Sequence, residues 1–63
     1  MNAWELTKLI ENQKHEIVQL IEKKRKTNKK EVRDLIDEEI NRKENIIFRT
    51  IEILKGVKVE WLN

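Results

Sequence analysis

Apolar residues recur every three or four positions through the first part of the chain. On a helical projection they fall within about 120° of one another, which is the pattern of an amphipathic helix with one buried face. Ala3 and Gln13 share this face, and Val18 lies at its edge. We therefore predict a helix over about residues 3–26, whose apolar stripe consists of Leu6, Leu9, Ile10, Ile17, Leu20 and Ile21.

The second half of the chain repeats the helical pattern with a wider stripe. Ile40 and Ile51 extend this stripe to one side. Gly56 favours the end of the helix, because glycine adopts the left-handed conformation at low cost, and Lys55 before it suits the negative end of the helix dipole. We predict a helix over about residues 29–55, with a stripe of Val32, Leu35, Ile36, Ile46, Ile47, Ile53 and Leu54.

Each predicted helix is preceded by the same start signal. Asn2 stands three residues before Glu5, and Asn28 stands three residues before Glu31. An Asn side chain can accept a hydrogen bond from the first helical turn, and a Glu at this spacing can reach back to the cap. The fold class is therefore all-α, a single domain over residues 1–63 that forms a two-helix antiparallel hairpin with its hinge near residues 27–28.

Polar residues interrupt both apolar stripes at their centres. Folding about the hinge brings Gln13 level with Lys43, and Ile17 level with Glu39. Glu39 and Lys43 are also a favourable pair four residues apart. Two interpretations stay open. The layer is either a solvated gap or a set of buried polar groups that fixes the register of an oligomer.

The apolar stripes are wider than the seam between two helices requires. A chain of 63 residues has a thin core, and the absence of cysteine removes disulfides as a second source of stability. We therefore predict a homodimer in which two hairpins form a four-helix bundle. Two alternatives remain: the exposed stripe binds a different protein, or the hinge straightens into one long helix that pairs as a coiled coil.

The C-terminal residues change period. Val57, Val59 and Trp61 alternate with Lys58, Glu60 and Leu62, which is the alternation of a strand. Too short to form a sheet alone, this segment needs a partner strand or a surface to cover. We predict a short extended tail over residues 56–63, which either packs on a neighbour or is frayed.

Positive charge gathers at the predicted hinge. The chain carries a net charge of only +2, so the hinge is a positive tip on a mildly acidic body. Such a tip attracts phosphate-rich partners, although lysines at a helix C-terminus also suit the dipole and turns are usually solvated. The candidate nucleic-acid contacts are Lys23, Lys24, Arg25, Lys26, Lys29 and Lys30.

The aromatic residues and the edge of the second stripe are candidates for protein contact. Trp4 lies away from the apolar stripe, Trp61 lies in the tail, and Phe48 lies on the outer side of the second helix. They form either an aromatic patch at the open end of the hairpin or, with the tail folded over Trp4, a small satellite core. The predicted partner-binding residues are Trp4, Ile40, Phe48, Ile51 and Trp61.

The sequence offers few residues suited to catalysis or metal binding. The chain lacks Cys and Ser, and it has one histidine, so we expect no enzyme activity, no cofactor and no metal site. Its apolar runs are too short for a membrane span, and we expect a cytoplasmic location. We predict a small regulatory or accessory protein, of the kind that phages and plasmids encode, acting by protein–protein interaction through the hairpin dimer. The alternative is nucleic-acid binding through residues 23–30.

Overall fold

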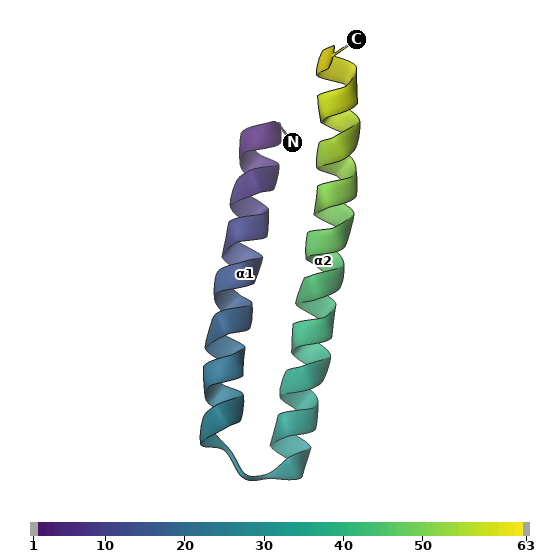
Figure 1. The fold of residues 1–63 in the computed structure, drawn as a ribbon. Coiled ribbons are helices and arrows are strands. Elements are labelled where there is room, and N and C mark those ends of the chain that lie inside the picture. Colours follow the sequence, from purple (N-terminus) through teal and green to yellow (C-terminus); the bar gives the residue numbers. More distant parts are fainter. Residues whose placement is uncertain (1, 63) are drawn as a thin grey trace.

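The computed structural model describes the backbone of residues 2–62 and the side chains of residues 2–56. Within this range the chain forms two helices, α1 (Ala3–Lys26) and α2 (Lys30–Leu62), and no strand. They run antiparallel and side by side, joined by a loop over residues 27–29 (Figure 1). The all-α class and the two-helix hairpin are thus confirmed.

The start of α1 follows its sequence signal. The Asn2 side-chain oxygen accepts a hydrogen bond from the Glu5 backbone N–H at 2.8 Å. The Asn2 backbone is extended, and its carbonyl accepts the first helical bond from Leu6 at 3.1 Å. Glu5 places negative charge in the first turn, where the helix dipole favours it. The predicted bounds of this helix and its capping residue are confirmed.

The start of α2 differs from the prediction, because Thr27 rather than Asn28 organises the loop. The Thr27 N–H donates to the Lys24 carbonyl at 3.4 Å, and its hydroxyl accepts from the Lys29 N–H at 3.4 Å. The first helical bond of α2 joins the Arg33 N–H to the Lys29 carbonyl at 3.0 Å, which puts Lys29 in the capping position. Asn28 is therefore a loop residue, and α2 begins one residue later than predicted.

The other end of α2 also differs from the prediction. The helix continues through Gly56 to Leu62, whereas a glycine that ends a helix has a positive φ, and Gly56 does not. Each residue added to a formed helix gains one backbone hydrogen bond. This gain outweighs the weak strand-like alternation after Gly56, so the backbone there is helical rather than extended. The side chains of residues 57–63 lie outside the described residues, so the contacts predicted for Trp61 and the tail stay predictions.

Two ion pairs between the helices fix their register. Lys24 Nζ lies 2.6 Å from Asp37 Oδ1, and Lys43 Nζ lies 2.6 Å from Glu16 Oε2. In this register Leu20 of α1 lies level with Ile40 of α2. The observed register is about one helical turn from the predicted register, in which Gln13 lies level with Lys43.

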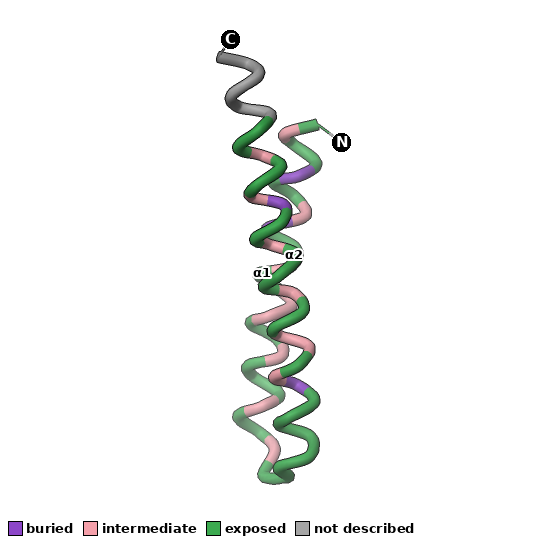
Figure 2. The backbone as a smooth tube through the Cα atoms, turned by 90° about the vertical axis from the view of Figure 1, so that its right-hand side faces the viewer, coloured by how far each residue is buried: buried purple, intermediate pink, exposed green. Residues whose placement is uncertain are grey.

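The two helices meet along a seam whose positions are three and four residues apart in alternation, as in an antiparallel coiled coil. Figure 2 shows the buried and half-buried positions recurring at intervals along both helices, with exposed positions between them. The buried apolar side chains among the described residues are Leu6, Ile10 and Ile36. The seam consists of Ala3, Leu6, Ile10, Gln13, Ile17, Leu20 and Lys24 in α1, and Ile36, Ile40, Lys43, Ile47, Thr50 and Leu54 in α2.

The unequal roles of the two Asn residues give a direct test. We expect Asn2→Ala to lower the free energy of unfolding by about 1 kcal/mol, because a first-turn N–H loses its acceptor. Asn28→Ala is the matched control and should change it by less than about 0.5 kcal/mol. Urea unfolding followed by circular dichroism at one protein concentration measures both, and equal losses would contradict the loop described above.

Candidate interaction surfaces

A polar layer around Lys43 crosses the middle of the hairpin. The Lys43 side chain is only 17% exposed, and its Nζ lies 2.6 Å from Glu16 and 3.7 Å from Glu39 Oε1. The hydrogen bond that Lys43 donates to Glu16 raises the pKa of Lys43 above its ordinary 10.5, and the charges of Glu16 and Glu39 add to this against the opposing effect of burial. Lys43 is therefore a well-paired cation within one chain.

The sequence anticipated part of this layer. The expected Glu39–Lys43 pair is present, but Lys43 bonds Glu16 in place of lying level with Gln13. Glu16 was missed because it flanks the apolar stripe of α1, and only the correct register brings it beside Lys43. The Gln13 side-chain oxygen is buried without a hydrogen-bond partner among the described residues. The role predicted for the layer in an oligomer stays a prediction.

One side of the hairpin exposes an apolar row on α2. Lys43 contacts both Glu16 and Glu39, so these two carboxylates mark the same side of the molecule. Residues seven apart share a helix face, and the side that contains Glu39 also holds four exposed apolar residues of α2. We call this surface the Glu39 flank and define it as Val32, Leu35, Glu39, Arg42, Ile46 and Ile53.

The opposite side of the seam carries the second apolar surface. We call it the Phe48 flank, and it consists of Val18 and Ile21 of α1 with Phe48 and Ile51 of α2. Phe48 is 65% exposed and Ile51 is half-buried. Among the other predicted contact residues, Ile40 lies half-buried in the seam. Its side chain packs within the hairpin, so less of it is available to a partner.

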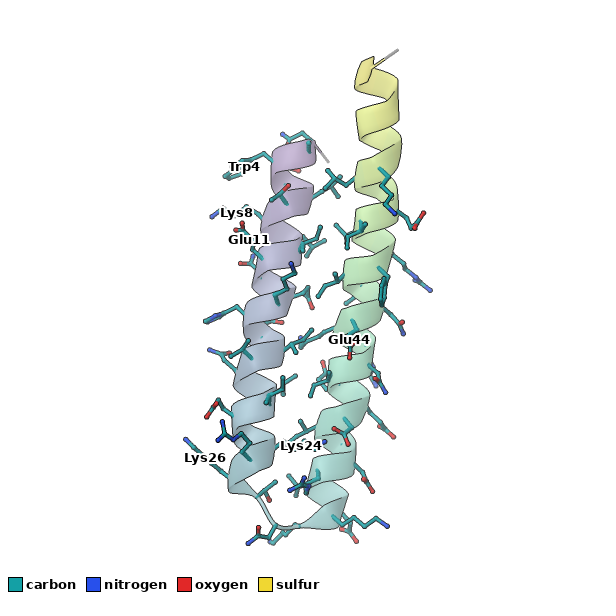
Figure 3. All side chains as sticks on the ribbon, in the orientation of Figure 1. Trp4, Lys8, Glu11, Lys24, Lys26 and Glu44 are labelled. Carbon is teal, nitrogen blue, oxygen red and sulfur yellow. The ribbon has the colours of Figure 1, made fainter. Side chains whose placement is uncertain are left out.

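Trp4 stands on the outer side of α1. Its side chain is 68% exposed and points away from α2 (Figure 3), and Lys8 Nζ lies 5.7 Å from the centre of its ring. The register puts Phe48 about two helical turns from Trp4 along the hairpin. The described residues thus leave Trp4 and Phe48 as two separate exposed aromatic side chains, and Trp61 lies outside the described side chains.

The basic tip is only partly neutralised. Lys24 points toward α2 and bonds Asp37, whereas Lys26 points away from α2 (Figure 3). Arg25 lies 3.4 Å from Glu22 Oε1. The sequence pattern did not predict the pairing of Lys24 with Asp37. Among the described side chains, the tip residues that are exposed and make no ion pair are Lys23, Lys26, Lys29 and Lys30.

The described part of the chain has no pocket, and it has no group of three His, Cys, Asp or Glu side chains that could hold a metal ion. Neither helix, as far as it is described, has an apolar stretch long enough to cross a membrane. Comparison with known protein families, curated proteins and solved structures finds no match to this chain. The two flanks, Trp4 and the basic tip are the surfaces from which a function can be proposed.

The paired state of Lys43 predicts a pH dependence. A pKa raised on folding stabilises the fold fully below the unfolded value of 10.5, and this contribution is lost as the pH rises through the folded value. We expect the free energy of unfolding to fall above pH 10.5 more steeply in the wild type than in Lys43→Met. Urea titrations of both proteins across the alkaline range measure the difference, and parallel pH profiles would contradict it.

Proposed function

We propose that this chain is a small non-enzymatic regulatory or accessory protein that acts by protein–protein contact as a homodimer of hairpins. The observation that carries the proposal is the excess of exposed apolar side chains. Eight large apolar residues are exposed and three apolar residues are buried among those described. Covering one exposed Leu, Ile or Phe side chain stabilises a complex by about 1.5–3 kcal/mol, so these surfaces favour association.

The composition of the seam supports the same proposal. Gln13, Lys24, Lys43 and Thr50 occupy seam positions that an apolar residue would fill in a self-sufficient bundle. A second hairpin packed on one flank would double the number of helices around the core and shield these polar layers from water. The chain has no cysteine that could supply a disulfide in its place.

A heterologous partner would find its anchors among the predicted contact residues. Trp4 and Phe48 are exposed on different parts of the surface, and aromatic side chains of this kind dominate the energetics of many interfaces. Ile51 would add apolar area beside Phe48, and Trp61 and Ile40 complete the predicted set. The dimer would present each of these residues twice.

Sedimentation equilibrium over a range of protein concentrations tests the dimer. We expect a concentration-dependent mass that approaches twice 7.7 kDa, with helical ellipticity and mass rising together. The reason is that dimerisation covers apolar surface that the hairpin leaves exposed. A fully helical species of 7.7 kDa at every concentration would contradict the homodimer.

A second candidate function rests on the tip. Lys23, Lys26, Lys29 and Lys30 are exposed and make no ion pair with a described side chain, so they could contact phosphates. In this case the chain should bind duplex DNA or RNA with an affinity that falls as salt rises. Reversing Lys29 and Lys30 to Glu should abolish binding, while the same reversal at Lys8 and Lys14 is the charge-matched control. Equal losses in both variants would argue against a specific role for the tip.

A further inference from the structure

We propose that the second copy of this chain binds on the Glu39 flank, with α2 antiparallel to α2 and a two-fold axis between Glu39 and Arg42. This inference rests on the proposed homodimer and names its contact face and orientation. Three steps lead to it: the spacing of apolar residues on α2, the charges between them, and an independent pair of charges on α1.

The Glu39 flank has the spacing of a second helix-packing seam. Its members on α2 are separated by three, four or seven residues, which keeps them in one row along the helix. This row is distinct from the seam that packs against α1, whose members are Ile36, Ile40 and Lys43. Leu35 and Ile53 are 65% and 56% exposed, so much of the row is left uncovered by the described part of the hairpin. A helix from another molecule fits it.

The charges between the apolar residues select the orientation. The Arg42 side chain is 72% exposed, and its guanidinium nitrogen lies 3.4 Å from a Glu39 oxygen of its own chain. This pairing is loose enough for the guanidinium to reach outward. Parallel packing would place Glu39 on Glu39 and Arg42 on Arg42. Antiparallel packing about a point midway between them places each Glu39 opposite Arg42 of the second copy. The same step brings Leu35 against Ile46 of the second copy, twice by symmetry.

A second antiparallel position is less favourable. Moving the axis two residues along α2 would place the charged Glu39 against Ile46 of the second copy and bring the two Arg42 side chains within one residue of the same level. Like charges across an interface disfavour such an alignment. The position between Glu39 and Arg42 joins opposite charges to each other and Leu35 to Ile46.

A pair of charges on α1 has the same centre. Glu16 lies on the same side of the hairpin as Glu39, because Lys43 contacts both, and Lys23 lies seven residues after Glu16 on that face of α1. The point midway between Glu16 and Lys23 lies half a residue before Leu20. Because the helices are antiparallel and Leu20 is level with Ile40, this point is level with the point half a residue after Ile40, which is the proposed axis. The same two-fold operation therefore places Glu16 opposite Lys23 of the second copy.

The Phe48 flank fails the same test. Asp37 and Glu44 lie on that side of α2, and the point midway between them falls at the same level as the axis proposed above. A second copy packed there about this level would place Asp37 opposite Glu44, which is a like-charge contact. At this level, charge complementarity favours the Glu39 flank over the Phe48 flank for self-association.

Two aspartate substitutions with equal starting exposure test the face. Leu35 and Phe48 are both 65% exposed, so replacing either by Asp removes little from the hairpin core. We expect Leu35→Asp to raise the dimer dissociation constant about tenfold or more, because it places a charge against Ile46 of the second copy. Phe48→Asp should leave the constant nearly unchanged. Sedimentation gives the constants, and circular dichroism verifies that both variants stay helical.

A charge-exchange experiment tests the orientation. Glu39→Arg alone and Arg42→Glu alone should each weaken self-association, because each puts like charges opposite one another at two contacts. Mixing the two variants should restore dimers that contain one chain of each, since opposite charges then meet at both contacts. A tag on one variant detects these mixed dimers by copurification. Glu38→Arg, an exposed neighbour off the flank, is the matched control and should dimerise normally.

The outcomes separate this inference from the proposed function. A wild-type chain that stays monomeric overturns both. A wild-type dimer that dissociates with Phe48→Asp but not with Leu35→Asp overturns the Glu39 flank and leaves the homodimer standing. A dimer that depends on Leu35, but in which the charge-exchanged pair forms no mixed dimers, overturns the antiparallel orientation.

Discussion

A helix with a broad apolar face needs more than one neighbour, and this hairpin supplies each of its helices with only one. The contact between α1 and α2 is a narrow seam with alternating spacing, and residues to either side of it stay in water. Much of the molecule follows from this limit. Few of the described apolar side chains are buried, and polar side chains such as Lys43 are tolerated between the helices. Apolar rows such as the Glu39 flank face outward.

The sequence predicted the elements of the fold where the chemistry is local. The bounds of α1 follow from the Asn2 cap and from an apolar period that recurs every three or four residues. The start of α2 was harder, because Thr27 bonds to Lys24 at the end of α1, to the capping residue Lys29 and to Arg33 of α2, and so competes with the Asn28 signal. The continuation through Gly56 was missed, because a glycine fixes a helix end only when it adopts a positive φ.

The surfaces were harder to predict than the helices, because they depend on register. A shift of one turn decides whether Lys43 meets Gln13 or Glu16, and the sequence pattern alone leaves that choice open. The same shift brings Ile40 into the seam beside Leu20 and separates Trp4 from Phe48. The exposed positions of Phe48 and Trp4 were foreseeable from the helical projection, since they lie outside both stripes. The helical projection did not predict which exposed residues of the two helices lie side by side.

The short loop over residues 27–29 has a consequence for how quickly the molecule takes shape. Its ends are close in sequence, so the first contacts between α1 and α2 close only a small loop and later contacts add to them one layer at a time. Helical hairpins with such local contacts fold within about microseconds to milliseconds. A partner at about micromolar concentration docks productively within about 0.1–10 s, which is slower than this folding. The encounter, rather than the folding of the hairpin, would then set the speed of binding.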